Sequence, residues 1–508
     1  MAVQLSYPGV YIDERSSGVR TITGVATSIT AFVGRALRGL VDEAQTITSY
    51  ADFERIYGGL WLDSMLGYAV RDFYQQGGTI AVIVRVHKAP AAGDDVATFS
   101  VGSGNAELKL RAASPGAWGS HLTATVDDDV PAGSPASVFN LTVVDPGRKT
   151  EIFRNVSFDL ASPRRVDIVV ANESTLVTVD GPLPTAAQAS FPASGSVTNS
   201  TGKDGDPVDA SVYTTGTDFR LNKRGLYALE DVDLVNLIVI PPYTTTGEVE
   251  AAALTDTIAY AHDRRAVVIL DPPASFTTVE ATTTAVGAIT TSRDAAVYYP
   301  RIRKPDPLRD GQLATFPPAG AVAGVIARTD ATRGVWKAPA GLDARIDGVS
   351  ELSVPLTDRE IGRLNPLGVN CLRAAPGAGH VVWGARTRDG NDRNASEWKY
   401  LPVRRTALFL EESLYRGTQW VVFEPNDAPL WAQIRLNVGA FMNNLFRQGA
   451  FAGTTPKEAY FVKCDAETTT QDDVNLGIVN IIVGFAPLKP AEFVVVAIQQ
   501  LAGQTGSA

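Results

Sequence analysis

The chain has 508 residues, of which 45% are hydrophobic, and a formal net charge of −10 at pH 7. This length exceeds a single ordinary core and predicts several domains, and the hydrophobic content is typical of packed globular protein rather than of a disordered chain. The acidic balance and the absence of a Lys/Arg-rich run argue against nucleic-acid binding, because phosphate contacts require a basic surface.

Targeting and cysteine signals are weak. The N-terminal sequence lacks the basic start and apolar run of a secretory signal, and no apolar stretch reaches the roughly 20 residues that cross a bilayer. We therefore expect a protein made in the cytoplasm without direct membrane insertion. Cys371 and Cys464 form no CxxC pattern, so they predict neither a disulfide framework nor a zinc site.

The first part of the chain predicts strand, helix, strand. Residues 30–34 and 79–86 are short apolar runs, and between them large apolar residues recur at helical spacing from Phe53 to Phe73. Gly77 and Gly78 follow the helix, where glycine accepts a positive φ without a Cβ clash. We expect a compact α/β unit.

Residues 91–205 predict a mainly β inserted domain. Turn-rich stretches separate short segments that we interpret as strands, among them Leu141–Asp145 and Val166–Val170. The range 182–207 is rich in small and turn-forming residues, so we expect an exposed excursion there.

The segment from 206 to 357 predicts a second α/β domain. A buried strand at 237–240, a helical stretch at 248–262 and a second strand at 266–273 repeat the strand, helix, strand order. Such repetition is typical of a doubly wound parallel sheet.

The last 150 residues begin with a predicted helix at 358–364 and strands near Leu372 and Val381. A long amphipathic helix follows Asn426 and Asp427, because Asp427 is a good N-cap and the apolar residues from 430 to 445 share one side. Its polar side contains Arg435, Asn443 and Arg447, and residues 428–453 contain no acidic residue.

Motifs along nearly the whole chain resemble the contractile tail sheath proteins of myophages, R-type pyocins and extracellular contractile injection systems. The matching segments are YPGVYIDE at 7–14, GLYALEDVDLVNLIVIPP at 225–242, YYPRIRKPDP at 298–307, GVWKAPAG at 334–341, LNPLGVN at 364–370, VVWGARTR at 381–388, FEPN at 423–426 and AFAGTTPKEAYFVKCD at 450–465. Their agreement with the family's order makes the resemblance specific. It does not cover residues 91–205.

The resemblance implies a multidomain α/β (α+β) fold. We expect a linking arm at 1–21, a core domain built from both chain ends (22–90 plus 358–508), the mainly β inserted outer domain at 91–205, and an α/β middle domain at 206–357.

The implied function is structural: copies polymerise helically around an inner tube and contract to drive that tube through a target envelope. The implied partners are further copies of the chain, the inner tube protein, and baseplate and tail terminator proteins, without a cofactor or metal. The assembled particle would be a virion tail or a cell-encoded injection device, which the sequence does not distinguish.

In the family, both chain ends cross to neighbouring subunits and complete their sheets. The resemblance assigns these inter-subunit strands to Gly9, Val10, Tyr11 and Ile12, and to Phe493, Val494, Val495, Val496, Ala497 and Ile498. The N-terminal assignment agrees with the residues, because a β-prone piece precedes a flexible link at Ser16, Ser17 and Gly18 and has little to pair with locally. The C-terminal run fits equally well as a buried strand of its own core, since both positions need unbroken apolar character. Residues 488–491 are a second hinge candidate.

The long helix after FEPN resembles the element that faces the inner tube. Arg435, Asn443 and Arg447 are therefore the expected tube-facing residues. The alternative from the residues alone is a solvated polar face.

A subtilisin-like hydrolase is the enzymatic alternative. Asp271 follows a predicted strand where α/β sites often lie, and the candidate bases are His87, His121, His262 and His380. The sequence lacks a GxSxG or GTSxA nucleophile segment and a phosphate-binding GxxxxGK[ST] loop, and the acidic loop at 465–473 lacks EF-hand spacing. We therefore expect no enzyme. A non-contractile tail or baseplate protein of related fold is the other alternative.

Overall fold

The computed structural model describes residues 20–91, 95–102, 107–135, 137–183, 196–198, 201–216 and 218–496. They divide into two compact units. Unit 1 contains the described residues of 1–25, 333–338 and 400–508, and unit 2 contains those of 26–332 and 339–399. Within these described ranges, no helix is both long and apolar enough to cross a membrane.

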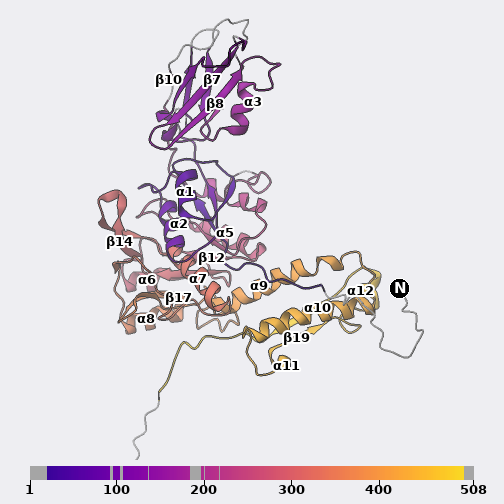
Figure 1. Ribbon diagram of the computed structural model, residues 1–508. Helices are drawn as coiled ribbons and strands as arrows, with labels where there is room; N and C mark the ends of the chain where they lie inside the picture. Colours follow the sequence, from indigo (N-terminus) through magenta and orange to yellow (C-terminus); the bar gives the residue numbers. More distant parts are fainter. Residues whose placement is uncertain are drawn as a thin grey trace, which may run out of the picture. The chain divides into compact units, whose positions relative to one another are not determined.

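The centre of unit 2 is an eight-stranded sheet (Figure 1). Its order is β18 (Gly379–Val382), β17 (Val369–Ala375), β13 (Ala295–Tyr299), β12 (Val267–Leu270), β11 (Leu237–Val239), β1 (Thr30–Gly34), β3 (Ala81–Arg85) and β2 (Ala44–Ile47). The six inner strands are parallel, and the outermost strand at each side is antiparallel. Every residue of β1, β3 and β13 is buried, which explains why these strands are apolar apart from Thr30, Arg85 and the tyrosines of β13.

Helices cover both faces of this sheet. They are α1 (Tyr50–Tyr57), α2 (Leu66–Gln75), α4 (Ala210–Tyr213), α5 (Ala251–Asp263), α6 (Val279–Ala285), α7 (Ala319–Arg333) and α8 (Asp358–Leu364), with short 3₁₀ turns at Gly225–Asp231, Val286–Ala288, Pro307–Arg309 and Asn365–Leu367. Phe32 of β1 packs against Phe73 of α2, whereas its neighbour Val33 belongs to the core cluster that includes Ile258 of α5. The predicted α/β class and doubly wound parallel sheet are confirmed. A three-stranded sheet of β15 (Gln312–Phe316), β14 (Ile302–Asp306) and β16 (Glu351–Leu352) extends unit 2.

The insertion forms a separate β lobe within unit 2, labelled β7, β8, β10 and α3 in Figure 1. One sheet has the order β10 (Ser196–Thr198), β4 (Thr98–Val101), β5 (Leu108–Ala112) and β9 (Val177–Val179), and the other has β6 (Thr123–Asp127), β7 (Val138–Asp145) and β8 (Lys149–Ser157). They share one apolar core, which includes Phe99, Leu110 and Phe139, with a 3₁₀ turn at Ala117–His121.

One strand prediction in this domain was wrong. Residues 166–170 form the start of helix α3 (Val166–Glu173). Val166, Val169 and Val170 are its buried residues, and this spacing of three and four is helical, which a run of valines satisfies as well as it satisfies a strand.

The structure distributes the α/β segments differently from the expected domains. Strands β1–β3 of residues 22–90 and β11–β13 of residues 206–357 share one sheet, since β1 pairs in parallel with β11. Residues 358–399 also join unit 2, where β17 pairs with β13. The physical reason is that local patterns identify a strand but do not specify its partner across a long connection.

Unit 1 contains the long helices α9 (Leu401–Gly417) and α10 (Ala428–Arg447), the short helices α11 (Pro456–Ala459) and α12 (Gln471–Asn475), a 3₁₀ turn at Gln419–Val421, and the strands β19 (Tyr460–Lys463) and β20 (Ile482–Phe485). Asp427 caps α10 by accepting a hydrogen bond from Leu430 N at 3.0 Å. Ile434, Val438 and Phe441 are among its buried residues, as the predicted amphipathic helix requires.

Candidate assembly site

A two-stranded antiparallel sheet, β19 with β20, lies beside α10 in unit 1. Val462 and Val483 on its inner side pack against the unit 1 core, whereas Phe461 and Ile482 on its outer side are 51% and 48% exposed. The Phe461 ring covers Gly484, where an added Cβ would lie 2.2 Å from the ring. Within the described part of the chain this sheet has no third strand. Its edges therefore provide a template for pairing with another chain.

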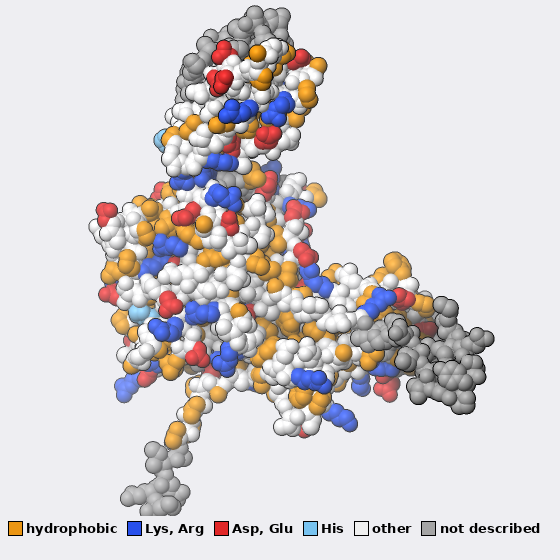
Figure 2. Space-filling view, viewed as in Figure 1, with side chains coloured by type: hydrophobic (Ala, Val, Ile, Leu, Met, Phe, Trp, Pro, Cys, Tyr) orange, Lys and Arg blue, Asp and Glu red, His pale blue; other side chains and the backbone are white. Residues whose placement is uncertain are grey.

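The C-terminal segment of unit 1 is exposed and apolar. Residues 488–496 form no helix or strand, and Figure 2 shows hydrophobic side chains along this narrow segment. Phe493, Val494, Val495 and Val496 are 74%, 82%, 90% and 76% exposed. Contiguous exposed apolar residues typically mark an interaction site. The interpretation of this run as a buried strand of its own core therefore does not hold for these four residues, which form no strand.

The other predicted linking residues lie outside the described residues. They are Gly9, Val10, Tyr11 and Ile12, the hinge residues Ser16, Ser17 and Gly18, and the last two residues of the C-terminal run, Ala497 and Ile498.

The three predicted tube-facing residues, Arg435, Asn443 and Arg447, have different surroundings in the structure. Arg447 is exposed and Asn443 is half-buried, but the half-buried Arg435 donates a hydrogen bond from Nη1 to the carbonyl oxygen of Cys464. Together with Asn443 and Arg447, Leu436 forms an exposed stripe of α10, and Leu436 is 53% exposed. Arg435 is therefore held by a backbone contact within unit 1, and of the two arginines only Arg447 is exposed.

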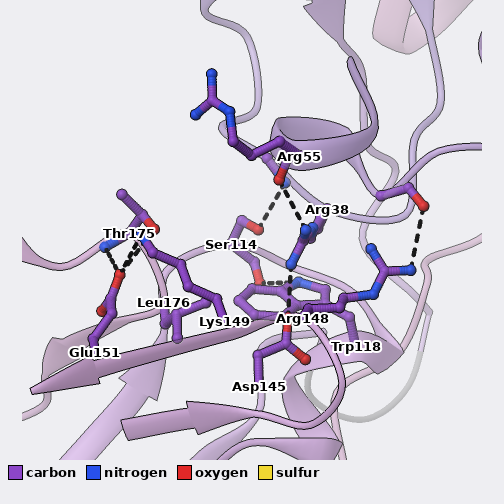
Figure 3. Close-up of polar contacts among 12 residues, drawn as sticks. Arg38, Arg55, Ser114, Trp118, Asp145, Arg148, Lys149, Glu151, Thr175 and Leu176 are labelled. Carbon is purple, nitrogen blue, oxygen red and sulfur yellow. Dashed lines mark hydrogen bonds and ion pairs between the residues drawn. The ribbon is translucent and has the colours of Figure 1, made fainter. Parts of the chain in front are cut away.

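Arginines join the β lobe to the rest of unit 2 (Figure 3). Arg38, which follows β1, donates from Nη1 to Asp145 Oδ2 of β7 at 2.7 Å and from Nη2 to the carbonyl oxygen of Arg55 at 2.8 Å. The almost fully buried Arg85 donates to the carbonyl oxygens of Gly39 at 2.6 Å and Pro115 at 2.8 Å. Each arginine thus connects the two parts of the unit.

A pocket of about 540 Å³ lies at this junction, and its lining includes Leu37, Trp118, His121 and Arg148. Burial lowers the pKa of Arg38, the positive charge of Arg148 lowers it further, and Asp145 opposes both effects. The sequence contains no local signal for this junction, since its contacts join single residues that are 30 positions apart for Arg85 and Pro115 and 107 apart for Arg38 and Asp145.

The hydrolase candidates have structural partners. Asp271 accepts a hydrogen bond from Ala319 N, at the start of α7, at 2.7 Å. Burial raises the pKa of Asp271 to about 7, although that backbone bond and the charge of Arg301 oppose the shift. His262 pairs with Asp294 at 2.9 Å and His87 with Asp95 at 3.1 Å.

The bonds described connect neither of those paired histidines to Asp271, as a catalytic triad would require. In the described residues, His, Cys, Asp and Glu form no group that could hold a metal ion.

Comparison with known proteins identifies relatives across the chain. The family model "Phage tail sheath protein central domain" matches residues 217–388, and "Phage tail sheath C-terminal domain" matches residues 393–500. A tail sheath protein of Vibrio phage KVP40 is 29% identical over 130 residues, which are 25% of this chain but only 19% of that protein. The chain thus matches about a fifth of the length of that relative.

A putative prophage major tail sheath protein of Pseudomonas aeruginosa (strain UCBPP-PA14) is 25% identical over 295 residues, covering 56% of this chain and 71% of that protein. The solved structure of the sheath complex of an extracellular contractile injection system (PVC) in the contracted state has a similar fold, with a TM-score of 0.60, 23% identity and coverage of 98% of this chain and 99% of that chain. The two matching family domains together cover more than half of the sequence, and the chain belongs to the phage tail sheath family.

Proposed function

We propose that this chain is the subunit of a contractile sheath, which polymerises helically around an inner tube and contracts to drive the tube through a target envelope. The observation that carries this proposal is the exposed apolar run Phe493–Val496 in a unit that also contains an incomplete two-stranded sheet. Family membership and the likeness to a contracted sheath support it.

The proposed link between subunits is strand addition. The C-terminal run of one copy would pair with an edge of the β19–β20 sheet of a neighbour, where backbone hydrogen bonds supply affinity. Val494 and Val496 would then point to one face of the completed sheet, and Phe493 and Val495 to the other. Phe461 and Ile482 make the outer face of this sheet apolar, which matches the apolar side chains of the C-terminal run.

The N-terminal residues Gly9–Ile12 would provide the second strand. Ser16–Gly18 and residues 488–491 would act as flexible links, so that subunits could move as near-rigid bodies while the strands stay paired.

The contact with the inner tube would use the exposed stripe of α10. Arg447 and Asn443 remain candidates, whereas Arg435 is engaged by Cys464. Each exposed ion pair contributes only about 0 to 1 kcal/mol. Many repeated weak contacts could therefore hold the tube until contraction releases it.

The remaining parts of the proposal follow from this role. The chain would be made in the cytoplasm of a bacterium and assembled with tube, baseplate and tail terminator proteins, without a catalytic activity. A baseplate role is the second candidate, because a chain in the baseplate structure of the anti-feeding prophage (AFP) has a similar fold, with 23% identity and a TM-score of 0.58.

Electron microscopy of the chain co-expressed with its tube and baseplate proteins tests the proposal. We expect striated sheaths from the wild type and none from Val494→Asp/Val495→Asp. Adjacent strand residues point to opposite faces, so one of the two aspartates would face the core side of the completed sheet and bury an unpaired charge. Leu160→Asp is the matched control, since Leu160 is a 73% exposed apolar residue of the β lobe. A wild-type chain that forms no sheath would contradict the contractile role, and normal sheaths from the double variant would contradict the linking role of the C-terminal run.

A further inference from the structure

The first described residues of the chain lie against the helices of unit 1. Arg20 N donates to Oδ1 of Asn437, a buried residue of α10, at 3.1 Å. The Arg20 guanidinium lies 4.6 Å from the centre of the Trp420 ring and 3.9 Å from a carboxylate oxygen of Glu424. The backbone and the side chain of Arg20 are thus fixed at the same place.

Two glycines, Gly417 of α9 and Gly24 of the segment itself, provide the space for the residues that follow Arg20. Ile22 is only 6% exposed and covers Gly417, the last residue of α9; a Cβ on Gly417 would lie 2.5 Å from Ile22 Cγ2. A Cβ on Gly24 would lie 2.8 Å from Cζ of Phe409, also in α9. The segment therefore approaches α9 more closely than a larger residue at either position would allow.

The segment is also held at its other end. Val25 N donates to Oγ of Ser413, a buried residue of α9, at 3.2 Å. Residue 25 is the last residue of unit 1 before the chain enters unit 2. Both ends of Arg20–Val25 are accordingly bonded to unit 1, and Ile22 fills the space between them.

We infer that Arg20–Val25 is an anchor, which fixes the base of the N-terminal segment to α9 and α10 of unit 1. A displacement of Arg20 is therefore transmitted directly to these two helices. The mechanical meaning of the anchor in a sheath rests on the proposed linking role, but the anchor itself is a property of the single chain.

Hydrogen exchange of the purified full-length chain tests the anchor. Gly417→Ala places a Cβ against Ile22 and should displace the segment, so that the amides of Arg20 and Val25 exchange at least about tenfold faster. Ile22→Ala removes the atoms that clash, Cγ1 and Cγ2, and leaves Ile22 Cβ 3.1 Å from the new methyl. The double variant should therefore regain protection relative to Gly417→Ala alone.

Gly439→Ala in α10 is the matched control, since a Cβ there meets nothing within 4 Å. The control should exchange like the wild type. If Gly417→Ala exchanges no faster than Gly439→Ala, or if the double variant exchanges as fast as Gly417→Ala, the anchor is refuted. This measurement needs no sheath, so its failure is distinct from a failure of the proposed function.

If sheaths form, a second result is expected from electron microscopy. Gly417→Ala sheaths should assemble with gaps or break on contraction, and the double variant should restore continuous sheaths.

Discussion

The ion pair between Arg38 and Asp145 should be a main source of stability where the β lobe joins the rest of unit 2. The perturbation is Arg38→Met, which keeps most of the side-chain volume and removes the charge. The guanidinium and carboxylate side chains are 12% and 8% exposed, and their closest atoms are 2.7 Å apart. Removing one partner of such a buried pair leaves the other charge desolvated and costs about 3–5 kcal/mol.

The structure offers a matched comparison. Arg303 Nη1 lies 2.6 Å from Glu351 Oε2, but these side chains are 38% and 52% exposed. Water already solvates both groups there, so Arg303→Met should cost only about 0–1 kcal/mol. Burial rather than distance decides the difference. Arg38→Met/Asp145→Leu removes both charges and should regain most of the stability lost in Arg38→Met.

Urea unfolding followed by circular dichroism, together with hydrogen exchange of β7 and of residues 36–39, measures these effects. We expect Arg38→Met to lower the urea midpoint and the protection of both segments, and the double variant to recover both. The reasoning is refuted if Arg38→Met is no more destabilising than Arg303→Met, or if the double variant is as unstable as the single one.

Three further predictions follow from individual contacts. Burial raises the pKa of Asp271 from 3.8 to about 7, so the folded chain binds this proton more tightly than the unfolded chain does. The contribution of Asp271 to stability therefore falls as pH rises from about 4 to about 7. Asp271→Asn should remove this pH dependence from Tm measured across that range. Gly484→Ala should cost about 1–3 kcal/mol in urea unfolding, since its Cβ would meet the Phe461 ring, and an unchanged midpoint would show that the ring moves freely. Arg447→Glu should weaken tube attachment in extended particles without changing Tm, whereas Arg435→Glu should lower Tm because it removes the bond to Cys464. If Arg447→Glu lowers Tm and leaves tube attachment unchanged, Arg447 is excluded from the tube contact.

The sequence predicts the elements whose signals are local. Asp427 and Pro429 mark the start of α10, and the buried apolar runs of β1 and β12 appear as strands where expected. The helix predicted at 358–364 is confirmed, and in the structure a capping box of Thr357 and Glu360 begins it. Each of these features depends on residues only a few positions apart, which is why one sequence is enough to find them.

Features that depend on distant residues could not be predicted in this way. The pairing of β1 with β11 joins residues about 200 positions apart, and the Arg38–Asp145 pair joins residues separated by 107. Arg435 shows the same limit on a smaller scale, because the helical pattern places it on the polar side but does not reveal the Cys464 carbonyl beside it.

The strength of the proposed link through the C-terminal run follows from its composition. Burying a valine or phenylalanine side chain contributes about 1.5–3 kcal/mol, while ordering the backbone of each residue costs about 1–2 kcal/mol. For the four residues Phe493–Val496, which are 74–90% exposed in the single chain, the two effects largely offset each other. One strand alone would then bind with a net gain of only a few kcal/mol, including its backbone hydrogen bonds. A sheath held by such links would be stable because each copy makes several of them at once, and it could still rearrange without unfolding its subunits.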